Sequence, residues 1–343
     1  MEQRIYQGII TLLFILTNTT FQAQMAWNLV WSEEFSGTTL NEEVWNYEIG
    51  FGNAGWGNNE LQYYRSGESN LIVADGKASI IAKQENFGSA EYTSARVQTK
   101  GKYDVQYGRI EARIKVPMGQ GLWPAFWMLG SNIDAVGWPE CGEIDILEHV
   151  NNEMQVHGTI HWDNNGHQYQ GGSISTDPDQ YHNYAIEWDA DQLRWYLDGI
   201  LYYTRNIGAA QYSEFHEPFF YILNVAVGGN WPGSPDNTTV FPAVMEVDFI
   251  RVYEWSELPT TVEGNGDNKK ISVVIYNNII QLSQLPSSAA SIQVYDVSGK
   301  LIQTIDTNGH TYAEVPNLTK GMYLVQLMDK DKKEMEQHKI VLF

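Results

Sequence analysis

The segment Arg109-Ile-Glu-Ala-Arg-Ile-Lys-Val116 alternates charged and apolar side chains along its whole length. Successive side chains of a β-strand point to opposite faces, so this pattern predicts a strand with one face in a core and the other in water. Similar β-rich runs, separated by Gly, Asn and Asp turns, are Leu71–Val73, Ala78–Lys83, Tyr184–Trp188, Leu193–Leu197 and Met245–Tyr253. Because no window has the period of a long amphipathic helix, we expect an all-β domain. An antiparallel β-sandwich, with a concave sheet for a chain-like ligand, satisfies this pattern.

Tryptophan content and charge divide the chain into two parts. All 12 tryptophans lie between Trp27 and Trp255, and the polar, Gly-containing residues 258–269 have no apolar periodicity, which predicts a linker. From Asn265 onward the chain has 8 lysines and 8 acidic residues, so the preceding part carries the whole formal charge of −21. Alternating runs in residues 270–343 predict a second, smaller β-sandwich.

The N-terminus and the charge indicate where the protein acts and on what. Residues 1–24 combine Arg4, a short apolar run over Ile9–Leu16 and a polar end, which is typical of a secretory signal peptide. A single cysteine, Cys141, rules out internal disulfides and fits a bacterial extracellular protein. The negative charge argues against nucleic acid as a partner and favours a neutral polymer over a sulfated polysaccharide.

Three carboxylates lie close together in Gly142-Glu-Ile-Asp-Ile-Leu-Glu-His149, an otherwise β-forming stretch. Their mutual repulsion is costly without a use. On a regular strand Glu143 and Asp145 share a face and Glu148 points the other way. We expect a β-bulge at Ile146–Leu147 that returns Glu148 to the face of the other two, because bulges are favoured beside active sites.

Such a set can hydrolyse a glycosidic bond with retention. One ionised carboxylate attacks the anomeric carbon, and one protonated carboxyl group protonates the leaving oxygen. Asp145, between the two glutamates, can share a proton and keep their pKa values apart. The alternative is a solvated acidic strand edge, but the flanking residues are apolar and aromatic rather than lysines.

At these residues the sequence resembles glycoside hydrolase family 16, whose signature is a Glu-x-Asp-x-x-Glu strand in a jelly roll, and more narrowly its bacterial laminarinases. The resemblance covers roughly Trp27 to Trp255 and includes the segments Gly55–Tyr64, Leu122–Gly130 and Asn224–Gly233. It implies a concanavalin-like jelly-roll catalytic domain over residues 25–257. In that domain Glu143 would be the nucleophile, Glu148 the acid/base and Asp145 the assisting carboxylate. The implied protein is a secreted, retaining endo-β-1,3-glucanase that needs no cofactor for catalysis.

Aromatic and polar residues of the same segments are candidates for binding sugar. Trp123, Ala125 and Trp127 alternate onto one face, so two indoles can stack on pyranose rings. The alternative for each tryptophan is core packing, and for His161 it is a histidine packed within the sheet. By the resemblance, the substrate-binding residues are Trp123, Trp127, Trp138, Trp231, Arg96, His161 and Asn58, with Asn59 and Glu60 as further candidates.

The resemblance also implies a structural calcium ion, held by Glu34, the carbonyl of Gly76 and Asp248. Calcium prefers oxygen ligands of this kind. Cys141 has no His/Asn partner pattern, so we expect it to be an inert small residue rather than a nucleophile.

The C-terminal part resembles the sorting domain of the type IX secretion system through Val294–Lys300, Lys320–Val325 and the closing Lys339–Phe343. This implies export across the outer membrane of a bacterium, to the cell surface or the medium, with the secretion machinery as a partner. A carbohydrate-binding module is the alternative, but the aromatic residues of this part lie mostly inside strand patterns.

Other functions of the main domain stay open at this point. Within the enzyme class these are cleavage of mixed-linkage β-1,3-1,4-glucan or of an agar- or carrageenan-type galactan. Outside it, a non-catalytic glucan-binding lectin can use the same jelly roll. The tryptophan-rich segments favour laminarin, the complete carboxylate set argues against a lectin, and we expect a monomer.

Overall fold

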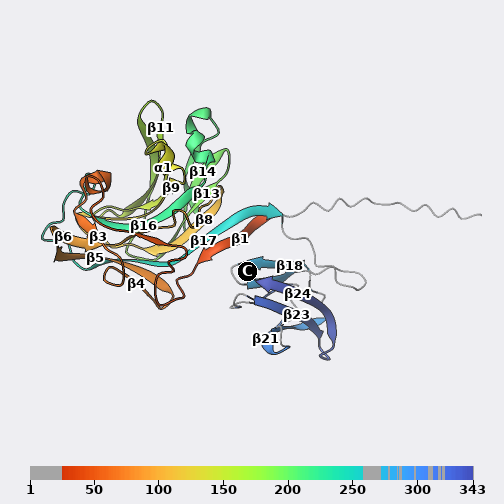
Figure 1. Ribbon diagram of the computed structural model, residues 1–343. Coiled ribbons are helices and arrows are strands. Elements are labelled where there is room, and N and C mark those ends of the chain that lie inside the picture. The colour runs from red at the N-terminus through yellow and green to blue at the C-terminus, as the bar shows by residue number, and fades with distance from the viewer. Residues whose placement is uncertain are drawn as a thin grey trace, which may run out of the picture. The chain divides into compact units, whose positions relative to one another are not determined.

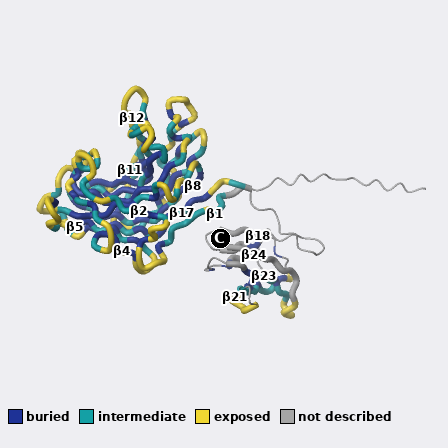
Figure 2. The backbone as a smooth tube through the Cα atoms, viewed as in Figure 1, coloured by how far each residue is buried: buried dark blue, intermediate teal, exposed yellow. Residues whose placement is uncertain are grey.

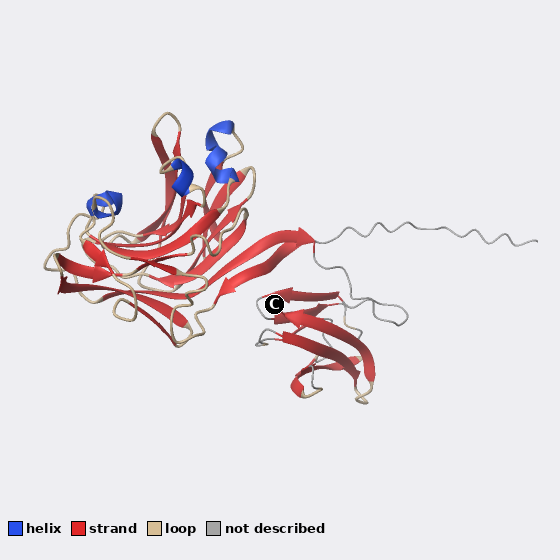
Figure 3. Cartoon of the chain, in the orientation of Figure 1, coloured by secondary structure: helices blue, strands red, loops and turns tan. Residues whose placement is uncertain are grey.

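A computed structural model describes residues 25–257 of the main domain and, near the C-terminus, residues 272–276, 279–283, 285, 288–296, 299–307, 312–315, 318 and 321–342. The predicted signal peptide, residues 1–24, and the predicted linker, residues 258–269, lie outside the described residues. The chain divides into two compact units, the larger formed by Trp27–Ser256 with Ile275–Ile279. Figure 3 shows that strands dominate the main domain and that its few helical segments are short.

The main domain consists of two large, mainly antiparallel sheets (Figure 1). The first sheet has the order β15-β14-β13-β8-β17-β5-β6-β3, with β1 paired to β17 and β4 paired to β5. Its strands are β1 (Met25–Glu33), β3 (Gln62–Tyr64), β4 (Leu71–Ala74), β5 (Lys77–Phe87), β6 (Ala90–Ser94), β8 (Gly108–Lys115), β13 (His182–Trp188), β14 (Gln192–Leu197), β15 (Ile200–Asn206) and β17 (Ala243–Glu257).

The second sheet has the order β12-β11-β10-β9-β16-β7-β2, and the predicted catalytic strand β10 is an interior strand between β11 and β9. Its strands are β2 (Asn46–Glu48), β7 (Arg96–Gln98), β9 (Leu122–Gly130), β10 (Glu143–Glu148), β11 (Gln155–Asp163), β12 (His167–Ser175) and β16 (Phe219–Val227). Three short helical segments lie in the connections, η1 (Gly55–Asn59), α1 (Ile133–Val136) and η2 (Ala210–His216). No helix among the described residues is long and apolar enough to cross a membrane.

The core lies between the two sheets, as the alternating pattern predicts. In β8 every second residue is buried, and Ile110, Ala112 and Ile114 have no exposed surface. These side chains belong to one hydrophobic cluster with Phe126 of β9 and Leu147 of β10, which are in the other sheet. Figure 2 shows the buried strands in the middle of the domain and the exposed connections around them. The predicted β-sandwich is therefore confirmed.

Strand β10 contains the β-bulge that the parity argument predicts. Against β9, Asp145 pairs with Trp127 and Leu147 pairs with Phe126, so β10 uses one more residue than its neighbour. The same shift appears against β11, between Asp145 and Glu148. The extra residue returns Glu148 to the face of Asp145, while the bulge residues enter the core.

A tryptophan of the first sheet supports the bulge from the core side. The indole Nε1 of fully buried Trp195, on β14, donates a hydrogen bond of 2.8 Å to the backbone oxygen of Asp145. Gly158 on β11 leaves the room for this indole, because a Cβ atom there would lie 2.3 Å from Trp195 Cδ1. The bulge carbonyl, which is displaced from the regular ladder, thus keeps a hydrogen-bond partner.

The C-terminal unit is also all-β. One sheet has the order β18-β19-β22 and the other β21-β20-β23-β24. The strands are β18 (Ser272–Tyr276), β19 (Ile279–Ser283), β20 (Ala289–Asp296), β21 (Leu301–Asp306), β22 (Tyr312–Val315), β23 (Gly321–Asp329) and β24 (Glu334–Leu342). The prediction of a second, smaller all-β unit agrees with these sheets.

We predict that Trp195→Phe destabilises the domain and loosens the bulge, because it leaves a buried carbonyl unpaired at a cost of about 1–3 kcal/mol. Trp188→Phe is the matched control, since the Nε1 of this buried tryptophan donates to Phe215 O at 3.0 Å, away from β10. Both variants should unfold at lower denaturant. Only Trp195→Phe should speed amide hydrogen exchange at residues 145–148. Equal exchange at residues 145–148 in the two variants would show that the hydrogen bond from Trp195 does not hold the bulge.

Candidate active site

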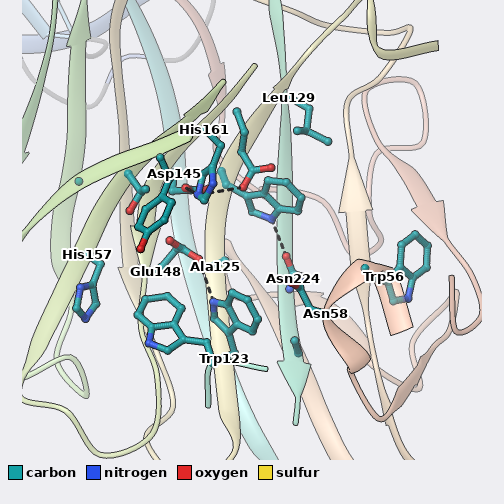
Figure 4. A pocket seen from close by; sticks show the side chains of 18 of the residues that line it. Trp56, Asn58, Trp123, Ala125, Leu129, Asp145, Glu148, His157, His161 and Asn224 are labelled. Atoms are coloured by element: carbon teal, nitrogen blue, oxygen red, sulfur yellow. Dashed lines mark hydrogen bonds and ion pairs between the residues drawn. The ribbon is translucent and has the colours of Figure 1, made fainter. Parts of the chain in front are cut away.

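A cleft of about 790 Å³ lies over the second sheet and is lined by side chains of β7, β9, β10, β11, β12 and β16 and by residues around η1 (Figure 4). The three residues that the sequence proposes for catalysis and the seven that the family resemblance implies for substrate binding all line it. They are Glu143, Asp145, Glu148, Trp123, Trp127, Trp138, Trp231, Arg96, His161 and Asn58. Residues spread over more than 170 positions of the sequence thus share one cavity. Their individual roles remain predictions.

Each glutamate of the carboxylate set accepts a hydrogen bond from an indole. Trp138 Nε1 donates to Glu143 Oε2 at 2.8 Å, and Trp123 Nε1 donates to Glu148 Oε1 at 3.0 Å. Trp123 and Trp138 were expected only to offer ring faces to sugar. The structure gives both an additional contact, because an indole N–H can stabilise and orient a carboxylate.

Burial and mutual repulsion alter the protonation of this set. Burial raises the pKa of Glu148 well above its usual value, and the charges of Asp145 and Glu143 add to the rise. Burial likewise raises the pKa of Asp145, together with the charge of Glu143 and a hydrogen bond to it. Two of the three groups therefore keep a proton at pH values where an isolated carboxyl group has lost it.

Arg96 fixes two aromatic rings on the side of the cleft near β7. Its guanidinium carbon lies 4.5 Å from the ring centre of Trp56 and 4.8 Å from that of Trp127, and it forms an ion pair with Glu48. Trp127 Nε1 also donates to Asn224 Oδ1 at 2.7 Å. The two rings are held in place before substrate arrives, which lowers the entropic cost of stacking on sugar.

A second aromatic group surrounds Glu148. Trp231 meets Trp123 edge to face, with ring centres 5.5 Å apart, and lies 5.1 Å from the ring of His157. In Figure 4, His157 and Trp56 lie on opposite sides of the labelled carboxylates. Trp231 is 43% exposed and Trp138 is 46% exposed, so both retain open ring surface that faces a ligand. Sugar rings can thus be held on both sides of the scissile bond.

The structure resolves which of the three candidates around η1 point inward. Asn58 and Glu60 line the cleft, whereas the side chain of Asn59 donates to Asn230 Oδ1 at 2.9 Å and does not. Glu60 is buried and accepts hydrogen bonds from Gln62 and Tyr64, at 2.7 and 3.2 Å. Burial raises the pKa of Glu60. Its bonds indicate that it organises the loop rather than catalyses.

Several cleft residues escaped the sequence reasoning, namely Trp56, His157, His167, Tyr169 and Asn224. His157 could have been found, because it alternates with Thr159 and His161 on one strand. His167 could not, since only the register of the β11–β12 hairpin brings it to His161. His149, which follows Glu148 directly, is buried, and its Nε2 lies 2.8 Å from the backbone oxygen of Glu153 rather than in the cleft.

Two of the three residues proposed to hold calcium are bound to arginines. Both oxygens of Glu34 accept hydrogen bonds from Arg251, at 2.8 and 2.9 Å, and one oxygen of Asp248 accepts from Arg113 at 2.6 Å. An ion at Glu34 would have to displace the guanidinium group of Arg251, and Gly76 lies in the β4–β5 turn. The calcium site stays an untested prediction.

Cys141 is buried beside the carboxylate strand. Burial raises the pKa of its thiol to about 12, with a further contribution from the charge of Glu143. The thiolate needed for nucleophilic chemistry is therefore scarce at neutral pH, in agreement with an inert role.

Comparison with known families places both parts of the chain. The model of glycosyl hydrolases family 16 matches residues 57–251, and the secretion system C-terminal sorting domain matches residues 269–342. The chain belongs to glycosyl hydrolase family 16 and is a glycoside hydrolase with a C-terminal sorting domain. That domain indicates export to the cell surface or secretion.

Relatives and solved structures agree with this family. The chain is 43% identical over 249 residues to a beta-glucanase of Rhodothermus marinus, covering 67% of this chain and 86% of the relative. It is 42% identical over 233 residues to the clotting factor G alpha subunit of Tachypleus tridentatus. That match covers 66% of this chain and 34% of the relative. An endo-1,3-beta-glucanase (laminarinase) catalytic domain of Thermotoga petrophila has a TM-score of 0.63 and 43% identity, covering 68% of this chain and all of that one.

We predict that Asp145→Asn changes how stability depends on pH. Because the pKa of Asp145 is raised on folding, the folded state binds its proton more tightly than the unfolded state. Wild type should therefore lose stability as pH rises above about 4, by up to about 1.4 kcal/mol per pH unit, until the raised pKa is passed. The asparagine variant lacks this loss. The difference in free energy of unfolding, variant minus wild type, should therefore increase as pH rises.

Asp189→Asn is the control of opposite sign. Although burial opposes it, hydrogen bonds from the Asp191 and Gln192 amides and from Arg194 lower the pKa of Asp189. The stability that this carboxylate contributes is present above its unfolded pKa and disappears as pH falls. Asp189→Asn should therefore be less stable than wild type at neutral pH. Chemical denaturation between pH 4 and 8 measures both, and parallel pH curves for Asp145→Asn and wild type would refute the prediction.

Proposed function

We propose that this protein is a secreted, retaining endo-β-1,3-glucanase that hydrolyses internal bonds of a laminarin-like glucan by double displacement. The observation that carries the proposal is the bulge in β10, which presents Glu143, Asp145 and Glu148 to one tryptophan-lined cleft. An open cleft of this kind admits the middle of a chain as well as its end.

In the first step, a Glu143 oxygen attacks the anomeric carbon while Glu148 gives its proton to the glycosidic oxygen. The C–O bond breaks, one part of the glucan leaves with a new hydroxyl group, and the other is held as an ester of Glu143. The raised pKa of Glu148 keeps it protonated for this step. The indole N–H of Trp138 helps to hold the attacking carboxylate in position.

In the second step, Glu148 is a carboxylate and takes a proton from a water molecule as the water oxygen attacks the anomeric carbon. Glu143 leaves as a carboxylate and Glu148 is protonated again. Asp145 lies between the two glutamates in the sequence of the strand. Its carboxyl group can share a proton with Glu143, both when Glu143 attacks and when it is released as a carboxylate.

The charge of the cleft supports a neutral β-glucan as the substrate. Four carboxyl groups line it, from Glu60, Glu143, Asp145 and Glu148, and the guanidinium of Arg96 at its edge is already paired with Glu48. A sulfated galactan would meet repulsion at close range. The identities of the relatives also favour a β-glucan. Relatives named as laminarinases or endo-1,3-beta-glucanases include matches at 41–44% identity. A keratan-sulfate endo-1,4-beta-galactosidase of Sphingobacterium multivorum, by contrast, is 34% identical.

Mixed-linkage β-1,3-1,4-glucan is the second candidate substrate. A non-specific endo-beta-1,3(4)-glucanase is 36% identical with a TM-score of 0.62, so the same fold accepts both linkages in a relative. A panel of laminarin, curdlan and mixed-linkage glucan, with sizing of the products, separates these candidates and reports endo action. A non-catalytic lectin would release no reducing sugar from any of them. Light scattering tests the expected monomer.

We predict that Glu143→Gln and Glu148→Gln each fold normally and lower kcat on laminarin by about 10²–10⁴-fold, because neither amide can attack carbon or transfer a proton. Glu246→Gln is the control, since Glu246 pairs with Lys77 on the first sheet and lies outside the cleft. The control should keep its activity. Turnover near the wild-type rate in either cleft variant would reject the assigned roles.

A further inference from the structure

Two histidines form a hydrogen-bonded pair on the wall of the cleft next to the carboxylates. His161 on β11 and His167 on β12 have ring centres 5.1 Å apart and planes tilted by only 11°. Their contact joins His161 Nδ1 to His167 Nε2 at 2.9 Å. On the other side of its ring, His161 Nε2 lies 3.3 Å from Asp145 Oδ2 and 3.7 Å from Glu143 Oε1.

These contacts make a continuous chain of titratable groups, from solvent-exposed His167 through His161 and Asp145 to Glu143. In a neutral histidine only one ring nitrogen carries hydrogen, and the partner of one nitrogen decides the state of the other. If His167 Nε2 donates to His161 Nδ1, then His161 must carry its own hydrogen on Nε2, which faces Asp145. If His161 Nδ1 donates instead, His167 Nε2 accepts, and Nε2 of His161 carries hydrogen only when the ring is doubly protonated. In each case the contact with His167 leaves His161 Nε2 directed at Asp145.

The surroundings of the pair favour this arrangement. The charged and titratable groups that face it are Glu143, Asp145 and Glu148 on β10, and Tyr169 on β12 stacks on His161 at 5.9 Å. Trp138, in the loop before β10, lies beside His167, with ring centres 4.6 Å apart. Asp163, which pairs with His167 across the hairpin, accepts from Gly166 N through Oδ1.

Burial lowers the pKa of His167, and the charge of His161 lowers it further, because two imidazolium rings in stacked contact would repel each other. A neutral His167 can donate to or accept from His161 Nδ1 through Nε2, so the contact persists in either tautomer.

We propose that His167 is a positioning residue for the hydrolytic reaction: it binds Nδ1 of His161 and thereby holds the His161 ring with Nε2 toward Asp145 and Glu143. This inference rests on the roles proposed for Glu143 and Asp145. An imidazole held at this distance contributes to the electrostatic field at both carboxyl groups during the two steps.

The test compares His167→Phe with His167→Gln. Phenylalanine keeps a flat ring beside Trp138 but has no donor or acceptor, whereas the glutamine amide can both donate to and accept from His161 Nδ1. We expect His167→Phe to lower kcat about tenfold with little change in KM. The pH dependence of kcat/KM should change as well, because an imidazole that is no longer held beside Asp145 and Glu143 alters the electrostatic field at these carboxyl groups. His167→Gln should recover most of kcat and of the pH profile.

Nitrogen NMR of histidine-labelled protein supplies a readout that does not depend on activity. In wild type and His167→Gln, the Nδ1 signal of His161 should show a hydrogen bond, and in His167→Phe that bond should be lost. A rise in KM alone, with an unchanged pH profile and unchanged His161 nitrogen signals, would show that His167 only contacts sugar and would overturn the proposal. If wild type cleaves no β-glucan, the proposed function fails, while the NMR measurement still tests the pair.

Discussion

The active site depends on one extra residue in strand β10. A regular strand would point Glu148 into the core, where an unpaired carboxylate is strongly unfavourable, and would leave Glu143 and Asp145 without an acid. The bulge between Asp145 and Leu147 places all three on the cleft side and sends apolar side chains inward. Because the bulge carbonyl is bonded to Trp195, the first sheet takes part in positioning the catalytic strand of the second.

Gathering three carboxylates at a buried site raises the free energy of the folded state, and the surrounding residues offset part of this cost. Indole N–H groups from Trp138 and Trp123 bind the two glutamates, and His161 faces Asp145. What remains uncompensated appears as raised pKa values at Asp145 and Glu148. That residual strain is useful to a glycosidase, since a carboxyl group that holds its proton near neutral pH can act as an acid.

Much of this arrangement can be predicted from sequence, because it follows from side-chain parity. The two-residue alternation of Arg109–Val116 predicts a half-buried strand, and the misfit of Glu148 predicts a bulge at Ile146–Leu147; the structure contains both. Parity also places Trp123 and Trp127 on the cleft face. The family resemblance adds Arg96, Trp138, His161, Trp231 and Asn58, which periodicity does not reveal.

Contacts between side chains from different strands could not be predicted in this way. The bond between His161 and His167 requires the register of a hairpin, and the bond of Trp195 to the bulge requires the packing of one sheet on the other. The same limit applies to Glu34: the family resemblance implies a calcium ligand there, and only the fold shows that both of its oxygens accept hydrogen bonds from Arg251. A residue type indicates what a group can bind, but the fold decides which partner reaches it.

The central claim is that Glu143 attacks carbon and Glu148 serves as its acid/base on the same bulged strand. Proton NMR during the first minutes of laminarin hydrolysis tests this most directly, because it records the anomeric configuration of each new reducing end before mutarotation. Double displacement predicts that the β-anomer is released first and the α-anomer accumulates later. Initial release of the α-anomer would mean a single displacement by water and would contradict the assignment of Glu143 as a nucleophile.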